Sequence, residues 1–309
     1  MLIAKGRQRL VAMAAATIGV GYCTIRQRSM CSAKEVVSKP LLLITDVDET
    51  LIGDAASLKR FNKEWCKFAE SEKGKGSYLA YNTARPLGPG HTGDGFIELV
   101  ASEKFPIMRP DLIIVSEGTE IYWLSEDKEF VADEEWKSKM SANWDDDLVQ
   151  KALKKYDEKI WKPERDMNAD DHYRYAITVS CEKEAKRIRD EAQAMLGPKY
   201  VVESCHGWLE NMWLVTALPA DAGKDKAAEH VRRTLGFENS DRVMWAGDSD
   251  NDVPMLNLTG TMSGVVVGNA KSEKLRSAAD SDAPVSKVYQ ASEDHAAGIL
   301  EGLRHFKYI

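Results

Sequence analysis

The stretch LLLITDVDET, residues 41–50, decides the fold of this chain. A run of apolar residues with strong strand preference ends abruptly in two aspartates, Asp46 and Asp48. Residues two apart in an extended chain point the same way, so both carboxylates could face one reacting atom. Two like charges side by side raise the cost of ionising each other. The pattern therefore predicts a buried strand whose end carries two acids with different tasks, in the presence of a cation.

Four more apolar runs follow this pattern beyond residue 39, separated by amphipathic stretches. The five strand candidates are residues 40–47, 77–83, 111–117, 242–248 and 264–270. Residues 57–73 and 225–235 are typical of helices. Strands that alternate with helices predict an α/β fold with a mainly parallel, Rossmann-like sheet.

The middle of the chain has a different character. It contains long charged stretches, the alternating segment YRYAITVSC and five of the eight tryptophans. We predict an α+β cap domain at 124–217, inserted into a core domain made of 39–123 and 218–309. Within the cap, four large residues recur every fourth position, which predicts one helix that buries this face. They are Trp136, Met140, Trp144 and Leu148.

The first 38 residues are basic and rich in alanine, and no acidic residue precedes Glu35. Their apolar stretch, 10–25, is short for a membrane span. We expect an organelle transit peptide, plastid rather than mitochondrial. A signal peptide or anchor and a start codon placed too far upstream are the alternatives, and without a leader we expect a cytoplasmic protein.

Composition limits the function classes. A net charge of −7 argues against a nucleic-acid-binding protein, which usually carries a basic face. The five cysteines show neither a CxxC pair nor zinc-ligand spacing, which argues against a disulfide framework. We expect no membrane span and no nucleic-acid partner.

Polar residues follow several of the predicted strands. In doubly wound sheets, the carboxyl ends of the strands form the ligand crevice, so we expect these residues to converge there. They are Thr83 and Arg85 in YNTARP, Lys224 in DAGKDKAAEHV, and Asp248, Asn251 and Asp252 in WAGDSDNDVPML.

Phosphoryl transfer is the chemistry that such a set can perform. Asp46 can attack phosphorus and form an aspartyl-phosphate. Asp48 can protonate the leaving alkoxide and then activate water. Thr83 and Lys224 hold the phosphate oxygens, and oxygen ligands suit Mg²⁺. The predicted Mg²⁺ ligands are Asp46, Asp48, Asp248, Asn251 and Asp252.

The segments DVDET, NTAR, GKDKA and GDSDND resemble, in order, the four motifs of the haloacid dehalogenase superfamily of phosphatases. The chain is more closely similar to the sucrose-phosphate phosphatase family, from about residue 40 to about residue 306. This resemblance implies a haloacid dehalogenase-type core with an inserted mixed α/β cap. The predicted substrate-binding residues are Thr83, Arg85, Glu117, His172, Arg174 and Lys224.

Two departures affect the expected specificity. The family usually has glycine where this chain has Ala84, and its Arg-Pro-His-Lys run in the cap becomes DHYRYAI here. We expect the second change to alter how the sugar is bound.

The expected function is a Mg²⁺-dependent sugar-phosphate phosphatase that hydrolyses sucrose 6-phosphate. One alternative is a superfamily phosphatase for another sugar or glycoside phosphate. The other is a non-catalytic binding partner of a glycosyltransferase. A sucrose-phosphate synthase-like glycosyltransferase is also the expected macromolecular partner of the enzyme.

If the leader is a transit peptide, a chain that starts near Val37 should fold and work as well as the full chain. Circular dichroism, solubility and phosphate release test this expectation. A loss of solubility or activity after the truncation would show that the leader packs on the domain.

Overall fold

The computed structural model describes residues 39–88, 95–101, 105–160, 171–207, 209–279 and 287–309. The predicted leader and part of the loop after Arg85 lie outside these residues. Within them, no helix combines the length and the apolar character needed to cross a membrane.

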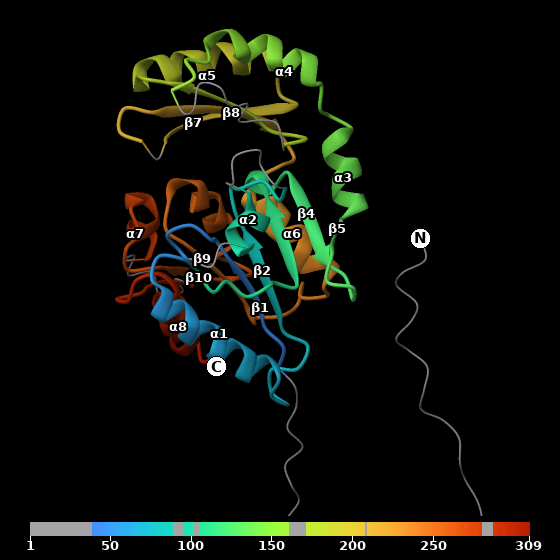
Figure 1. Cartoon of the computed structure of the whole chain (residues 1–309), viewed down its shortest axis with the longest axis vertical. Helices are drawn as coiled ribbons and strands as arrows, with labels where there is room; N and C mark the ends of the chain where they lie inside the picture. Colours follow the sequence, from blue (N-terminus) through green and yellow to red (C-terminus); the bar gives the residue numbers. More distant parts are fainter. Residues whose placement is uncertain (1–38, 89–94, 102–104, 161–170, 208, 280–286) are drawn as a thin grey trace, which may run out of the picture. The chain divides into compact units, whose positions relative to one another are not determined.

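An eight-stranded sheet forms the larger part of the fold (Figure 1). Its order is β11 (Val288–Gln290), β10 (Ser263–Val266), β9 (Val243–Gly247), β1 (Leu42–Thr45), β2 (Tyr78–Asn82), β3 (Leu112–Val115), β4 (Glu120–Leu124), β5 (Phe130–Ala132). The strands from β11 to β3 pair in parallel, whereas β4 and β5 are antiparallel. The α/β prediction and all five strand candidates are confirmed.

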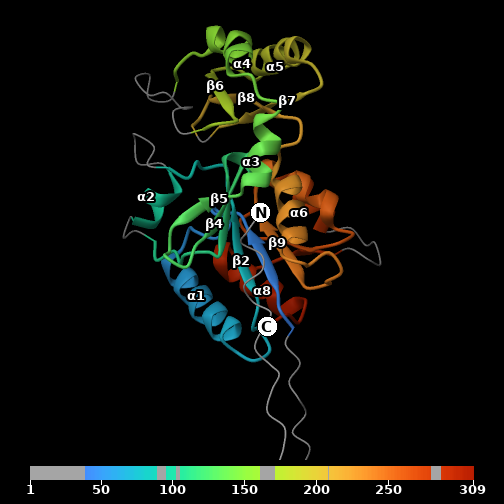
Figure 2. The ribbon, with the colours of Figure 1, turned by 90° about the vertical axis from the view of Figure 1, so that its right-hand side faces the viewer.

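Helices cover both faces of this sheet, which explains why β1 is apolar at three successive positions, Leu42 to Ile44, rather than at alternate ones. Leu41 and Leu43 pack with α1 (Ala55–Ala69) and α8 (His295–His305). Leu42 and Ile44 pack in a second cluster with α6 (Lys224–Thr234). Figure 2 shows α1 and α6 on opposite sides of the sheet.

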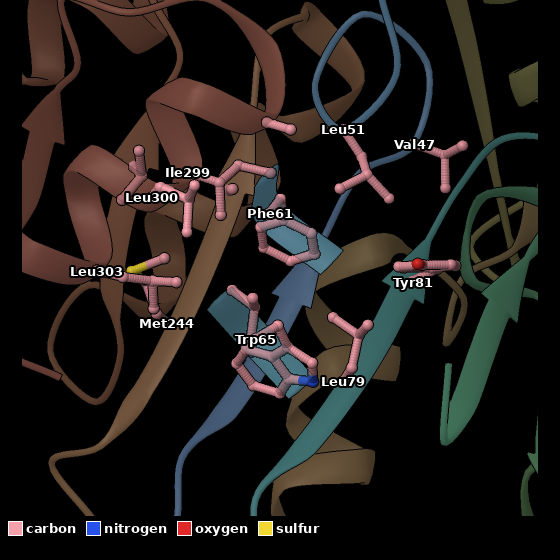
Figure 3. Close-up of a cluster of buried hydrophobic side chains, with 14 of the residues drawn as sticks. Val47, Leu51, Phe61, Trp65, Leu79, Tyr81, Met244, Ile299, Leu300 and Leu303 are labelled. Atoms are coloured by element: carbon pink, nitrogen blue, oxygen red, sulfur yellow. The ribbon is translucent and has the colours of Figure 1, made fainter. Parts of the chain in front are cut away.

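Helix α1 shows how the sequence sets this packing. Asp54 begins the helix by accepting hydrogen bonds from the Ala56 and Ser57 N–H groups, at 3.2 and 2.7 Å. Its apolar residues recur at helical spacing and include Phe61 and Trp65, which lie among residues of α8 and β2 (Figure 3). Fully burying one such side chain contributes about 2 kcal/mol.

The remaining helices of the described core are short. They are α2 (Phe96–Ala101), α7 (Glu273–Ala279) and the 3-10 segments η1 (Ser116–Gly118) and η3 (Asp250–Leu258).

A second, antiparallel sheet of order β6-β8-β7 lies in the region between β5 and α6. It consists of β6 (Tyr175–Val179), β7 (Tyr200–His206) and β8 (Trp213–Pro219). The helices α4 (Asp146–Leu153) and α5 (Glu182–Leu196) cover one of its faces, and η2 (Lys154–Tyr156) follows α4 (Figure 1). The eight-stranded sheet includes β5 and therefore continues past residue 124, the predicted start of the cap. The domain boundaries stay predictions.

The single helix predicted from the four-residue recurrence was wrong. The structure has α3 (Glu134–Ser141) and α4 instead, because Asp145 begins a new helix by accepting a hydrogen bond from the Leu148 N–H. Trp136 and Met140 are buried in the cluster with α6, whereas Trp144 is partly buried against the second sheet. The recurrence thus spans two separate cores.

Asp133 begins α3 and holds it to α6. Its carboxylate accepts hydrogen bonds from the Trp136 N–H, the Trp123 indole and the His230 ring, at 2.9, 2.9 and 3.1 Å. Burial alone raises the pKa of Asp133, but these hydrogen bonds outweigh it and lower the pKa to about 2.

We expect Asp133→Asn to lower the free energy of unfolding by about 2 kcal/mol at neutral pH, because the ionised form loses its native stabilisation. The pKa is lower in the folded chain than its ordinary value of 3.8, so this stability is complete above that value and is lost as pH falls towards 2. Urea denaturation over a pH series measures it, with the exposed Asp127→Asn as control. A difference from the wild type that does not shrink in acid would contradict the assignment.

Candidate active site

Asp46 stands directly after β1, where the sheet changes its direction of winding. Strands β2 and β9 flank β1 on its two sides, and ligand crevices form at such switch points. The Asp46 N–H donates to the Ala246 carbonyl at 3.0 Å, which extends the pairing with β9 by one residue. The Asp46 side chain is therefore fixed beside Asp248, the first residue after β9.

A tight turn brings Asp252 to the same place. The Asp252 carboxylate accepts hydrogen bonds from the Asp248 and Ser249 N–H groups, at 3.0 and 3.2 Å. It also lies against Gly247, where an added Cβ would stand 2.6 Å from the Asp252 Cγ. Glycine is needed at 247 because the carboxylate occupies the space of a side chain.

Lys224, the first residue of α6, joins two of these acids. Its Nζ donates to Asp46 Oδ1 at 2.9 Å and to Asp252 Oδ1 at 2.7 Å. Burial alone lowers the pKa of Lys224, but the carboxylates of Asp252 and Asp46 raise it overall. The lysine is therefore a fixed positive charge.

The cluster still holds three buried carboxylates against one ammonium. Desolvation raises the pKa of Asp46 well above its usual range, and the charges of Asp252 and Asp248 add to this rise. The ammonium of Lys224 lowers the pKa and compensates for it only in part. Desolvation and the charge of Asp252 also raise the pKa of Asp248 to about 6. These acids favour an additional cation in their midst.

The geometry of the three carboxylates suits a divalent metal. Asp46, Asp248 and Asp252 each offer an oxygen, and the three oxygens lie within 4.8 Å of one another. Hard divalent cations take carboxylate oxygens as ligands. Thr50, which sequence reasoning missed, orients this set because its hydroxyl donates to Asp248 Oδ1 at 2.8 Å. Its place within DVDET, two residues after Asp48, was the available signal.

The other two predicted ligands have different partners. Asp48 lies outside the group of three and forms a two-pronged ion pair with Arg85, with both N–O distances 2.7 Å. The Asp48 side chain is 43% exposed, so it stays accessible to a reactant. Asn251 accepts a hydrogen bond from the Ser249 hydroxyl at 2.8 Å.

Thr83 follows β2 and is buried at the same edge of the sheet. Its hydroxyl oxygen accepts a hydrogen bond from the Arg85 N–H at 3.1 Å. The preceding Asn82, which the sequence pattern also did not indicate, donates from Nδ2 to the Lys224 carbonyl at 3.1 Å. Asn82 thereby ties the end of β2 to the start of α6.

The remaining predicted residues lie between the core and the second sheet. Arg174 Nη1 is 4.0 Å from Glu117 Oε1, and the guanidinium also pairs with Asp171 at 2.7 Å. His172 contacts Glu120 instead, with 3.1 Å between Nδ1 and Oε2. The structure thus brings Glu117 and Arg174 together and places His172 with another acid.

Strand β7 adds two side chains that the sequence reasoning did not select. Glu203 and Cys205 are two residues apart and share one face of β7. Desolvation raises the pKa of Cys205 to about 12, and the carboxylate of Glu117 adds to the shift. Desolvation and Glu117 likewise raise the pKa of Glu203. Both residues are nevertheless exposed to solvent, and strand alternation was the only signal for them.

The family model described as sucrose-6F-phosphate phosphohydrolase matches residues 39–307. The chain belongs to this family. The sucrose-6F-phosphate phosphohydrolase family consists of phosphoric monoester hydrolases, and membership together with the buried acidic group indicates a divalent metal.

Curated relatives agree with this family membership. Probable sucrose-phosphatase 3b of Arabidopsis thaliana is 26% identical over 275 residues, which cover 86% of this chain and 60% of the relative. The chain therefore spans about 60% of the length of such plant relatives. Mannosylfructose-phosphate phosphatase of Agrobacterium fabrum is 25% identical over 87% of this chain and 98% of its own.

Solved structures show the same fold. The sucrose-phosphatase from Synechocystis sp. PCC6803, in complex with sucrose and phosphate, has a TM-score of 0.66 and 24% identity. The match covers 87% of this chain and 98% of that chain. A haloacid dehalogenase-like hydrolase from Bacillus subtilis has a TM-score of 0.57 and 17% identity, over 88% and 94% of the two chains. The predicted haloacid dehalogenase fold is confirmed.

We expect divalent chlorides to raise the melting temperature of this protein. An ion that binds only the folded chain stabilises it by about 2.7 kcal/mol at a hundred times its Kd. Asp248→Asn removes one ligand charge and should abolish most of the shift, whereas Asp127→Asn, in an exposed loop, should leave it unchanged. Differential scanning calorimetry measures the shift. Equal shifts in both variants would exclude a metal at Asp248.

Proposed function

We propose that this protein is a Mg²⁺-dependent sugar-phosphate phosphatase that hydrolyses sucrose 6-phosphate through an aspartyl-phosphate. The observation that carries the proposal is the buried group of Asp46, Asp248 and Asp252 around Lys224 at the switch point of the sheet. Phosphoryl transfer needs an oxygen nucleophile and concentrated positive charge, and this group provides both.

Asp46 is the nucleophile. Its carboxylate oxygen attacks phosphorus, the bond between phosphorus and the sugar oxygen breaks, and an acyl phosphate forms on Asp46. Water then attacks the same phosphorus and releases inorganic phosphate, which restores the carboxylate. The pairing of Asp46 with β9 and with Lys224 holds its side chain in one orientation for both steps.

Asp48 is the acid and base. It gives a proton to the sugar oxygen as that oxygen leaves, and it accepts a proton from the attacking water. Arg85 donates to both oxygens of Asp48, which fixes the orientation of the Asp48 side chain.

The phosphate oxygens need donors as charge accumulates on them. Lys224 supplies an ammonium and Thr83 supplies a hydroxyl at the ends of neighbouring elements. Asp46, Asp248 and Asp252 hold the Mg²⁺, which when bound offsets the negative charge of the phosphoryl group and of the acids.

The names of the relatives support a sugar phosphate as substrate. Several carry the name sucrose-phosphatase, and the Synechocystis structure contains sucrose and phosphate. The Agrobacterium relative, which is named for mannosylfructose phosphate and has nearly its whole length matched, favours a second candidate, another sugar phosphate. A glycosyltransferase partner and a plastid location stay predictions.

Phosphate release from a panel of sugar phosphates, with and without Mg²⁺, tests the substrate. We expect the highest kcat/KM for sucrose 6-phosphate, with loss of turnover when the metal is chelated. Good activity on another sugar phosphate and none on sucrose 6-phosphate would select the second candidate.

Asp46→Asn should abolish turnover and leave the fold intact, because an amide is a poor nucleophile of nearly the same shape. Phosphate release and circular dichroism measure the two properties. Asp127→Asn serves as the matched control, which should keep full activity. Mg²⁺-dependent turnover in Asp46→Asn would rule out the aspartyl-phosphate mechanism.

A further inference from the structure

Three consecutive carbonyl groups follow β2, in the segment that carries Thr83 and Arg85, and each accepts a hydrogen bond. The Thr83 carbonyl accepts from the Glu117 N–H at 3.2 Å, and the Arg85 carbonyl accepts from the Ser116 N–H at 2.9 Å. The carbonyl between them, that of Ala84, accepts from Arg174 Nη1 at 2.7 Å. The backbone of this segment is therefore held by the Ser116–Glu117 turn of the core and by the side chain of Arg174, which directly precedes the second sheet.

The core turn has an unusual backbone. Ser116 and Glu117 are consecutive residues with positive φ angles, 50° and 59°, a region that non-glycine residues rarely occupy. Such a conformation persists only where its surroundings impose it. Here both N–H groups donate to the Thr83–Arg85 segment, and the Ser116 hydroxyl donates to Asp171.

Asp171 and Arg174 form a buried ion pair between these two structures. Their side chains are 1% and 12% exposed. Arg174 donates from Nε and Nη2 to one oxygen of Asp171, at 3.1 and 2.7 Å, while the other oxygen accepts from Ser116. Arg174 immediately precedes β6, so the pair links the second sheet to the Thr83–Arg85 segment.

We infer that Asp171 and Arg174 are positioning residues that hold Thr83 and Arg85 in place for the reaction. Asp171 orients the guanidinium, and the guanidinium and the Ser116–Glu117 turn together fix the three carbonyls. This fixes the Thr83 hydroxyl and the pair between Arg85 and Asp48. The inference rests on the proposed function and replaces the expected sugar contact of Arg174 with a role in the core.

The two roles of Arg174 predict different kinetics. If Thr83 and Asp48 are misplaced, the chemical step slows for every alkyl phosphate, because each releases an alkoxide that Asp48 must protonate. Small displacements cost up to about 10²-fold. A lost sugar contact slows only the hydrolysis of sugar phosphates.

The test uses the double variant Asp171→Asn with Arg174→Met in the full chain. It removes both charges together, so that no buried charge is left unpaired and the fold is kept. We expect kcat to fall by about 10²-fold on both sucrose 6-phosphate and ethyl phosphate, a small ester that also releases an alkoxide, with smaller changes in KM. The single variant Arg174→Lys, which keeps a donor, should have a kcat between those of the double variant and the wild type. Arg187→Met, which removes an exposed arginine of α5, is the control and should change neither substrate.

Hydrogen exchange of the Ser116 and Glu117 amides gives a readout that does not need turnover. Both should exchange at least about tenfold faster in the double variant, because the acceptor segment is no longer held. A loss of kcat confined to the sugar phosphate, or unchanged exchange at these two amides, would overturn the inference. If the wild-type protein hydrolyses no sugar phosphate, the proposed function is contradicted. The positioning role of Asp171 and Arg174 is then decided by the hydrogen-exchange result.

Discussion

The burial of Asp46 and Asp252 on either side of Lys224 is the interaction on which the rest of the structure depends. Removing one partner of such a buried pair typically costs about 3–5 kcal/mol, because the remaining charge has no water to solvate it. The lysine starts α6, and the two acids follow β1 and β9. The start of α6 and the ends of β1 and β9 must therefore meet at one end of the sheet. Their packing is mediated by buried residues that include Leu42, Ile44 and Val231.

Helix α6 serves two regions at once. It begins at Lys224 in the acidic group. Six residues later, the His230 ring packs tilted against Trp136, with 5.0 Å between the ring centroids, and is hydrogen-bonded to Asp133 at the start of α3. The chain segment that leads towards the second sheet is thus anchored on the helix that begins with Lys224. Arg174, which contacts the Thr83–Arg85 segment, provides a second connection between the region of the second sheet and the candidate active site.

Particular elements show how far sequence reasoning reaches. Strands β1, β2, β3, β9 and β10 were predictable because each contains a short run of consecutive apolar residues, as is typical of strands buried on both faces. Strands β5 and β11 were not, since each has three residues and Val131 of β5 is 53% exposed. The break between α3 and α4 was missed because the apolar spacing continues across it, although Asp145 had the side chain of a helix start.

By itself the sequence determined which residues form the candidate site: acids and donors placed where apolar runs end, which a parallel sheet brings together. Local pattern was sufficient because strand pairing fixes where those ends lie. Only the tertiary structure decided the partners of the individual side chains. In the folded chain, Asp48 lies apart from the other acids and forms an ion pair with Arg85. Arg174 pairs with Asp171 and donates a hydrogen bond to the Ala84 carbonyl. Most of these contacts join residues far apart in the chain, and no local spacing encodes which of several nearby charges will be closest once the chain is folded.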